Sequence, residues 1–310
     1  MNSSSNKYDH LFYNVIPNAI GGVKIFGYSD NYYKPQKYDE VTNLENRLWT
    51  ELYQRLELIL NQYTSKEYLI GLMALPIPRD RFPKFESISP IIFNSTGWSL
   101  YPVSGFLEEK LFFDLNNQRN FPVTDIIRKS PRFTDKYLGV DIKNNEGYTP
   151  EPDIFHDVQA HVPFLMNKEY ADFIWEVGSL GYKILKNEKS LELDLVEHNL
   201  KRLQNFAWWT YEFGLVRNKG ESDIFRREKN NIDYEIYGAG IISSYDETCN
   251  VINCAKGKSR ASKFLKYDIN EMVLTCFDYS NIQDRYYVAD SMEEVYDSFR
   301  QNQDLFNFVG

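Results

Sequence analysis

Leucines recur at every fourth position in the first strongly patterned part of the chain. They are separated by polar residues over 43–62, and the set is Leu44, Leu48, Leu52, Leu56 and Leu60. A hydrophobic side chain at every fourth position forms a stripe along one face of an α-helix. The pattern therefore predicts an amphipathic helix over 43–62 whose leucine face packs on a core.

Three later stretches also have helical patterning, over 108–118, 164–185 and 191–214. The last of these carries Glu212 near its C-terminal end, where Gly214 is a suitable stop. Between the helices, the chain is expected to form loops around the prolines at 76, 78 and 83 and a turn at 94–97. A short strand is expected over 98–103, and 232–242 is more β-like. The polar, turn-rich stretch 129–147 indicates a loop or lid.

The share of helical patterning predicts a mainly α protein with small β elements. No internal repeat or low-complexity tract interrupts the 310 residues, which can bury a substantial core. The length allows one large domain or two small ones, and we favour a single domain over 41–310. Residues 1–40 lack sustained periodicity and are expected to form an N-terminal arm that packs on it.

The charge balance and the cysteines exclude several classes of protein. A formal net charge of −9 without a basic stripe argues against a nucleic-acid partner. Three cysteines without a CxxC pair support neither a disulfide framework nor a zinc ribbon, and fit a reducing cytoplasm. The N-terminus lacks an apolar signal region, and no apolar run approaches the ~18 residues of a membrane span. A cytoplasmic protein without a membrane or nucleic-acid partner is expected.

Two of the four histidines, His156 and His161, lie five positions apart behind a Pro-Glu-Pro-Asp turn. Neutral imidazoles suit Fe, Zn or Cu(II), and two of them with one carboxylate form the ligand set of non-heme Fe(II) oxygenases. On an ideal α-helix such positions lie roughly 140° apart, which requires a metal near a helix end. Pro163 is expected to mark that end. The alternative is that both histidines are hydrogen-bonded core residues.

Three ordered motifs accompany this pair, Tyr148-Thr-Pro-Glu-Pro-Asp-Ile-Phe-His-Asp157, Trp208-Trp-Thr-Tyr-Glu-Phe-Gly-Leu215 and Tyr237-Gly-Ala-Gly-Ile-Ile-Ser-Ser244. Together they resemble the pterin-dependent aromatic amino acid hydroxylases, the family of phenylalanine 4-monooxygenase. The likeness covers roughly residues 40 to 300. It implies a single catalytic non-heme iron domain of that type over 41–310.

The resemblance assigns His156, His161 and Glu212 as ligands of Fe(II). It places Asp157 near a tetrahydropterin cofactor, tetrahydrobiopterin or a related compound. It also gives Ser243, beside the substrate pocket, a hydroxyl that orients a ligand imidazole.

The flat pterin ring requires an aromatic face and backbone groups that match its edge. By resemblance, the segment that binds it contains Gly105, Phe106, Leu107 and Phe112, with Phe112 in the stacking role. Phe113 is the alternative if the helix phase differs by one residue.

The substrate side chains are also assigned by resemblance. Arg128 would bind the carboxylate of an amino acid through its planar guanidinium, with Thr149 nearby. The ring would lie against Trp208, with Pro152 and Phe213 closing the pocket. A surface salt bridge is the alternative role for Arg128.

Three departures from the family pattern stand beside the match. Ala160 replaces a glycine, Ala207 replaces a tyrosine, and about ten extra residues separate His161 from Glu212. The chain also lacks the family's N-terminal regulatory domain and long C-terminal oligomerisation helix, so a monomer is expected.

The expected function is ring hydroxylation of a free aromatic amino acid with dioxygen, with phenylalanine as the leading substrate. The same chemistry on tryptophan or tyrosine, or at a non-para ring position, is an alternative. A zinc metallohydrolase and a non-catalytic iron-binding relative are alternatives of other classes.

Overall fold

The computed structural model describes residues 6–13, 33–103, 107, 109–128, 153–186 and 192–309. The longest helices in this part are α1 (Asn43–Tyr63), α5 (Lys168–Lys186) and α6 (Leu193–Ala207). The shorter ones are α2 (Lys66–Ala74), α3 (Phe85–Thr96), α4 (Glu109–Asn117), α7 (Ala239–Ile242), α8 (Tyr245–Ala255), α9 (Ile269–Met272) and α10 (Met292–Gln301).

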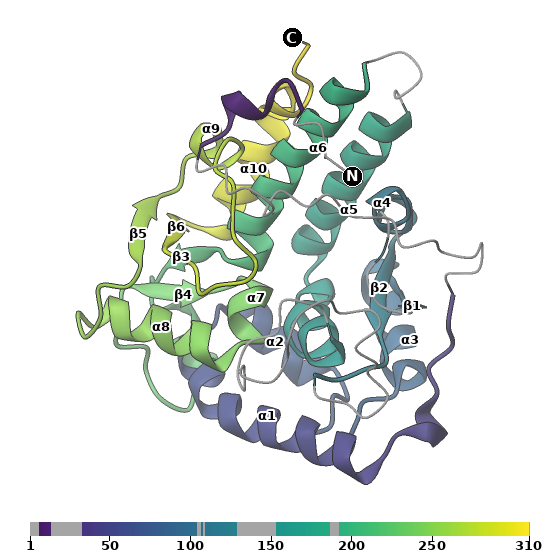
Figure 1. Cartoon of the computed structure of the whole chain (residues 1–310). Helices are drawn as coiled ribbons and strands as arrows, with labels where there is room; N and C mark the ends of the chain where they lie inside the picture. The colour runs from purple at the N-terminus through teal and green to yellow at the C-terminus, as the bar shows by residue number, and fades with distance from the viewer. Residues whose placement is uncertain are drawn as a thin grey trace.

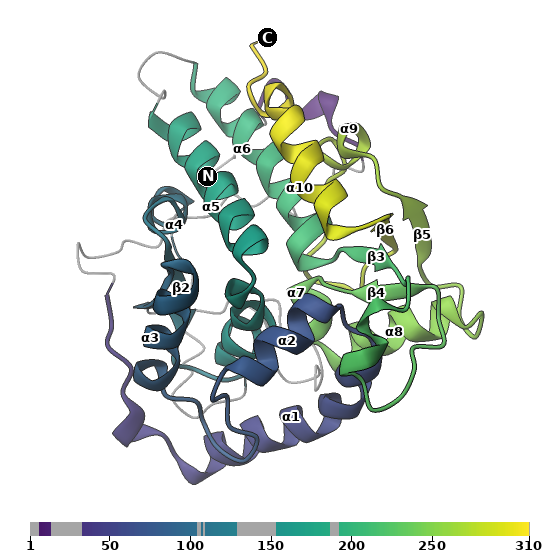
Figure 2. The same ribbon diagram turned by 180° about the vertical axis from the view of Figure 1, so that it is seen from behind.

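Two small sheets flank the central helices. A parallel pair joins β1 (Ser99–Val103) to β2 (Asn120–Thr124). The other sheet has the strand order β4 (Tyr234–Ile236), β3 (Leu215–Arg217), β6 (Arg285–Ala289) and β5 (Lys263–Lys266), with only β3 and β4 antiparallel. Helices α5 and α6 lie side by side between the two sheets, and α1 crosses beneath them (Figure 1 and, from behind, Figure 2). The mainly α architecture with small β elements is confirmed.

Helix α1 forms where the leucine stripe predicts it. Thr42 and Glu45 form a capping box at its N-terminus, which satisfies two backbone N–H groups. The C-terminal leucines of the stripe are buried, whereas Leu44 is 44% exposed. A strict period of four drifts around a helix of 3.6 residues per turn, so one end of the stripe leaves the core. Trp49 and Tyr53 complete the buried face.

Several other expectations are confirmed, including the helix at 109–117 and the strand at 99–103. The turn expected at 94–97 is the end of α3, where Gly97 adopts a positive φ of 78° as the C-cap. Helices α2 and α3, which lie on either side of the proline-containing loops, are not among the helices predicted from the sequence. The stretch 129–147, expected to form a loop or lid, lies outside the described residues.

The prediction of β structure over 232–242 is right for β4 and wrong beyond it, because α7 follows. Close packing explains the change. A Cβ atom at Gly238 would lie 2.4 Å from the carbonyl oxygen of Glu212. The chain can therefore approach the backbone of Glu212 only through glycine, and α7 starts at that contact.

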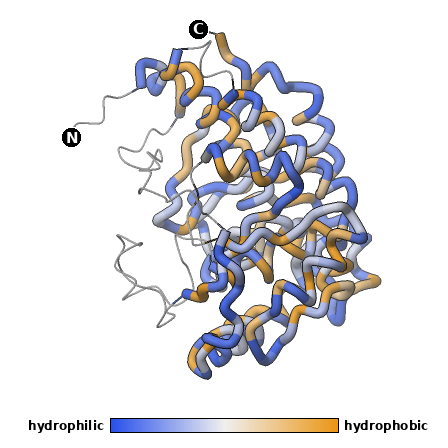
Figure 3. The backbone as a smooth tube through the Cα atoms, turned by 90° about the vertical axis from the view of Figure 1, so that its right-hand side faces the viewer, coloured by the Kyte–Doolittle hydropathy of each residue, from blue (hydrophilic) through white to orange (hydrophobic). Residues whose placement is uncertain are grey.

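One hydrophobic cluster runs through the described helices and both sheets. Hydrophobic and hydrophilic positions alternate along the helical turns, as amphipathic packing requires (Figure 3). The described parts of the N-terminal arm lie against this body. The Asn6 side chain donates to the carbonyl of Asp194, Phe12 is buried, and Tyr13 pairs with Thr275 in an isolated bridge. Among all the residues that the structure describes, no helix is long and apolar enough to cross a bilayer.

Candidate metal and substrate site

The two histidines lie on a π-helix, Phe155–His161. A π-helix has i→i+5 hydrogen bonds, so residues five positions apart are neighbours on the same face. This geometry reduces the roughly 140° offset that an ideal α-helix would give His156 and His161. The expectation that Pro163 ends the helix is wrong. A 3₁₀-helix, Val162–Met166, continues the helical path, and Pro163 lies in its first turn, where a missing N–H costs nothing.

Glu212 reaches the same point from a second π-helix. Helix α6 ends at Ala207, and Trp208–Glu212 continues it as a π-helical turn. The predicted helix over 191–214 is thus α-helical only as far as Ala207. Widened turns of this kind are frequent at functional sites, and here both of them carry the candidate ligands.

The three side chains converge on one point. The Nε2 atoms of His156 and His161 are 3.0 Å apart. The Glu212 carboxylate lies 3.1 Å from His161 Nε2 and 3.5 Å from His156 Nε2. All three ligand atoms lie within 4.8 Å of one another. Two imidazole nitrogens and one carboxylate oxygen facing one point form the facial triad that suits Fe(II).

The pKa shifts of His156 and Glu212 fit metal binding, which requires neutral imidazole and ionised carboxylate. Removal from water lowers the pKa of His156 to about 4, although the nearby Glu212 carboxylate opposes this effect. Burial favours the neutral acid of Glu212, but the attraction of His161 and His156 outweighs it and lowers the pKa of Glu212 below its ordinary value. Both shifts favour the forms of His156 and Glu212 that can bind a divalent cation.

The far nitrogen of one ligand imidazole is held by Ser243, the C-cap of α7. His156 Nδ1 lies 2.9 Å from Ser243 Oγ, which leaves Nε2 directed at Glu212 and His161. Such a contact restricts the rotation of a ligand imidazole. The structure thus brings Ser243 to the position expected from the sequence.

Ser243→Ala is expected to weaken iron binding by about 10- to 100-fold, because the His156 ring loses its orienting partner. Neighbouring Ser244 provides a matched control, since its hydroxyl caps α8 by accepting from Glu247 N at 3.2 Å. Ser244→Ala should cost about 1 kcal/mol of stability and leave iron affinity unchanged. Iron titration in the presence of a competing chelator would compare the two variants. Equal iron affinities in both would contradict the role of Ser243.

Arg128 is buried and paired within the protein. Its Nε and one terminal nitrogen donate to the two carboxylate oxygens of Asp153 at 2.8 and 2.9 Å, and another terminal nitrogen donates to the carbonyl of Ser243 at 3.0 Å. Burial opposes ionisation of Asp153, but the guanidinium outweighs it and lowers the pKa of that carboxyl. Asp153 also accepts from the backbone N–H of His156 at 2.9 Å. Arg128 is therefore fixed next to the metal ligands.

The residues expected near the pterin are partly described. Phe113 is 4% exposed and packs directly on Gly181 of α5, whereas the neighbouring ring of Phe112 is only half-buried. The structure therefore favours Phe112 over Phe113 as a ring that can stack. Leu107 is also half-buried, while Gly105 and Phe106 lie outside the described residues.

Asp157 is buried beside the triad, and its carboxylate accepts from the backbone N–H of Thr124 at 2.8 Å. Burial raises the pKa of this carboxyl well above its ordinary range. Asp157 thus follows a candidate ligand directly and is tied to strand β2.

Trp208 and Phe213 form an aromatic pair at the start and just past the end of the second π-helix. Their ring centroids lie 4.5 Å apart with stacked planes. Trp208 is half-buried and Phe213 is buried. Ala207, immediately before Trp208, is also half-buried and leaves that position without a large side chain, whereas Ala160 is fully buried in the first π-helix. Thr149 and Pro152 lie outside the described residues.

A buried acid, Glu247, is linked to Trp208 of this pair through hydrogen bonds made by Gln283. Glu247 is fully buried, accepts from the Tyr286 hydroxyl at 2.6 Å and from Gln283 N at 3.1 Å, and has no partner for its other oxygen. Burial raises the pKa of Glu247 to about 7. The folded protein therefore favours the protonated carboxyl.

This raised pKa makes the free energy of unfolding depend on pH. The contribution of Glu247 is greatest below the pKa of the unfolded chain, falls as pH rises towards 7, and is constant above that. Glu247→Gln keeps an acceptor for both partners without the charge. It should match the wild type near pH 4 and be more stable at pH 8 by about 3 kcal/mol. Urea denaturation at both pH values measures this, with exposed Glu51→Gln as the control. Parallel pH profiles for Glu247→Gln and the wild type would contradict it.

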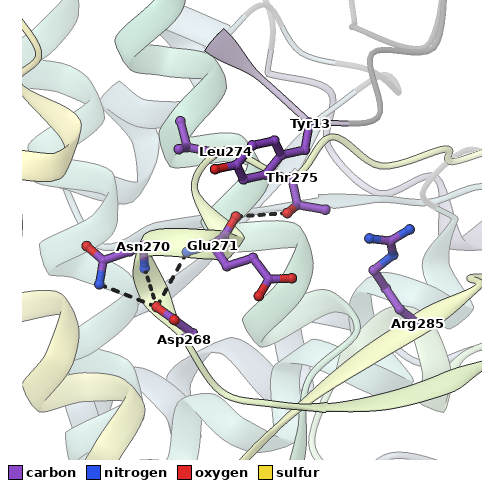
Figure 4. Close-up of a pocket in the computed structure, with 7 residues that line it drawn as sticks. All are labelled: Tyr13, Asp268, Asn270, Glu271, Leu274, Thr275 and Arg285. Atoms are coloured by element: carbon purple, nitrogen blue, oxygen red, sulfur yellow. Dashed lines mark hydrogen bonds between the residues drawn. The ribbon is translucent and has the colours of Figure 1, made fainter.

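A separate hollow of about 570 Å³ lies under the N-terminal arm, and no member of the triad lines it. Figure 4 shows its lining residues, Tyr13, Asp268, Asn270, Glu271, Leu274, Thr275 and Arg285. Asp268 caps α9 by accepting from the backbone N–H groups of Asn270 and Glu271. The hollow thus joins the arm to the end of α9.

Comparison with known proteins places this geometry in a family. Residues 26–307 match the model of the biopterin-dependent aromatic amino acid hydroxylases. The chain belongs to this family. The hydroxylase is 28% identical over 265 residues to the phenylalanine-4-hydroxylase of Ralstonia nicotianae, covering 86% of this chain and 72% of the relative. It is 30% identical over 263 residues to that of Caulobacter vibrioides, covering 84% and 75%.

Solved structures of relatives show the same architecture. The iron- and phenylalanine-bound phenylalanine hydroxylase of Chromobacterium violaceum superposes on this hydroxylase with a TM-score of 0.70 at 28% identity, over 92% of this chain and 90% of the other. A structure of the same protein with iron(III) and oxidised 7,8-dihydrobiopterin also gives 0.70 at 28% identity, over 94% of each chain. This hydroxylase is a pterin-dependent aromatic amino acid monooxygenase, and its triad has the donors that iron requires.

One important side chain of the site, that of Asp153, was not predicted from the sequence. Asp153 was interpreted only as part of a Pro-Glu-Pro-Asp turn, yet it pairs with Arg128 and caps the backbone of His156. Its place three residues before the first histidine was the available signal, because an Asp so placed can accept from a helical N–H.

Proposed function

We propose that this hydroxylase holds Fe(II) with His156, His161 and Glu212 and, with a tetrahydropterin and dioxygen, hydroxylates the ring of free phenylalanine. The convergence of the three ligand atoms within 4.8 Å, on two π-helical turns, carries the proposal. A zinc site of the same ligands would not explain the family's dependence on a pterin.

Phenylalanine is proposed because the relatives from Ralstonia nicotianae and Caulobacter vibrioides are named phenylalanine-4-hydroxylases and a related structure contains bound phenylalanine. An amino acid substrate needs a cation for its carboxylate and an apolar wall for its ring. Arg128 supplies the buried cation. Its guanidinium donates to the carbonyl of Ser243, and the Ser243 hydroxyl contacts the proposed iron ligand His156. Trp208 and Phe213 supply the wall, and we propose that Thr149 and Pro152 complete the pocket.

The bound metal and pterin supply the activation of dioxygen. The residues of the chain orient and shield the reactants. Ser243 contacts Nδ1 of the His156 imidazole and keeps the ring in the orientation that presents Nε2. Asp153 holds the guanidinium of Arg128 in one plane, so that a carboxylate meets a preformed cation rather than a flexible one. Phe112 is proposed to stack on the pterin ring together with the segment Gly105–Leu107, and Asp157 to lie at its edge.

Mass spectrometry of products tests the function directly. The Fe(II)-loaded protein is given tetrahydropterin, ¹⁸O-labelled dioxygen and a mixture of phenylalanine, tyrosine and tryptophan. One labelled oxygen atom on phenylalanine is the expected result. A labelled product from another amino acid would correct the substrate. Absence of any labelled product, with iron bound and pterin unconsumed, would refute the monooxygenase function.

We also propose that residues 41–310 act as one catalytic domain with residues 1–40 as an arm, and that the protein is a monomer. The contacts of Asn6 and Phe12 with the body support the arm. All three cysteines are free, which supports a reducing compartment such as the cytoplasm. Light scattering of the iron-loaded protein would test the oligomeric state.

A further inference from the structure

The indole of Trp208 is held on three sides. Phe213 stacks at a centroid distance of 4.5 Å, and Phe277 stacks at 4.0 Å with planes only 8° apart. Two rings this close to one indole cannot share a face without overlapping, so they cover opposite faces. The indole N–H donates to Gln283 Oε1 at 3.0 Å. Only the remaining edge of the half-buried Trp208 can meet another ring.

Gln283 is itself fixed by every polar group that it has. It is 3% exposed, and its Nε2 donates to the carbonyls of Asp278 and Asn281, both at 2.8 Å. Its backbone N–H donates to Glu247 at 3.1 Å, and its carbonyl accepts from Ser262 Oγ at 2.5 Å. The amide can turn away from Trp208 only by breaking the two Nε2 hydrogen bonds as well, and each break would leave a buried polar group unpaired.

The same residue also shapes the segment that carries Phe277. The two Nε2 bonds close the loop 278–282 onto Gln283, directly after Phe277. One side chain therefore fixes both the rotation of the indole and the approach of a ring that covers it. A buried glutamine at this place is not needed to fill space, since a leucine would do so without desolvating an amide.

We propose that Gln283 is a positioning residue for the substrate ring, which acts by holding Trp208 so that its free edge faces the bound aromatic amino acid. The inference rests on the proposed function, because Trp208 is the proposed wall of the ring pocket. Aromatic pairs prefer edge-to-face geometry when stacking is blocked. A fixed indole edge would thus set the plane of the substrate ring relative to the proposed iron ligand Glu212, which lies on the same π-helix.

A double-mutant cycle tests this role. Gln283→Leu removes the indole acceptor, and Trp208→Phe removes the indole N–H. Gln283→Leu alone should raise the Kd for phenylalanine about 5- to 10-fold, the effect of one lost hydrogen bond. It should also lower the product formed per tetrahydropterin oxidised, because a misplaced ring misses the oxidant. In the Trp208→Phe background, Gln283→Leu should have no further effect on either quantity.

Calorimetric binding of phenylalanine to the anaerobic iron-loaded protein gives Kd, and turnover assays give the ratio of product to oxidised pterin. Asn281→Ala perturbs the same loop without touching Trp208 and should leave both quantities unchanged. If Gln283→Leu does not fold, Gln283→Met replaces it. Met has a similar length and also removes the oxygen that accepts from the indole, so the same rise in Kd is expected.

A full effect of Gln283→Leu in the Trp208→Phe background would overturn the proposal, since the residue would then act through the fold alone. No effect on Kd in the wild-type background, from Gln283→Leu or from Gln283→Met, would overturn it too. Failure of the proposed function is recognised separately, because the unmodified protein would then yield no hydroxylated amino acid. That result would overturn both.

Discussion

Glu212→Ala is expected to empty the metal site and to reduce hydroxylation by more than about 100-fold, beyond the 10- to 100-fold losses typical of residues that only support a ligand. Glu212 supplies the only carboxylate of the triad found in the described residues, and its oxygens lie 3.1 and 3.5 Å from the two imidazoles. Without it, two neutral nitrogens remain, and the site loses its negative charge. Iron content by elemental analysis and turnover with phenylalanine measure the effect.

The matched control removes a carboxylate elsewhere. Glu176 pairs with Arg300 at 2.9 Å on the surface, so Glu176→Ala should leave iron content and turnover at the wild-type level. One iron per chain and normal turnover in Glu212→Ala would contradict the ligand assignment.

Arg128→Met is expected to lower the free energy of unfolding by about 3 to 5 kcal/mol, the usual result of leaving one member of a buried ion pair alone. Asp153 is 1% exposed and would keep an uncompensated carboxylate in the interior. Binding of the amino acid should weaken as well, because the proposed carboxylate partner is gone. Chemical denaturation measures the first effect and calorimetry the second.

A double-mutant cycle with Asp153→Leu separates the loss of stability from the loss of substrate binding. The double variant removes both charges and should recover part of the lost stability, because no buried charge remains alone, although the backbone N–H groups of Arg128 and His156 lose their acceptor. It should not recover substrate binding. Equal stability of Arg128→Met and the wild type would contradict the account of the pair, and unchanged phenylalanine binding would contradict the role of Arg128 towards the carboxylate.

Regular helices were predictable where hydrophobic spacing alone decides the structure. The leucines of 43–62 gave the position of α1 to within one residue, and 108–118 contained α4. Where a contact between residues distant in sequence decides the local structure, the hydrophobic period did not predict it. The residues after β4 become helical because Gly238 packs on the backbone of Glu212, 26 positions earlier in the chain.

The candidate site likewise contains residues that the motifs predict and features that depend on contacts distant in sequence. The motifs identified His156, His161, Glu212 and Ser243, which the structure brings together. The two π-helical turns were not predictable, since a widened turn has no hydrophobic period of its own and depends on the packing around it. Gln283 was also missed, because the hydrogen bond that joins it to Trp208 spans 75 positions. Such a partner has no signal in a local pattern.

The π-helical turns bear on how such a site arises. A turn closed by an i→i+5 bond contains one residue more than an α-helical turn. Each of the two metal-bearing turns therefore has the form that an ordinary helix takes after gaining a single residue. Removing one residue from either turn would restore an α-helical turn and move its ligand away from the other two.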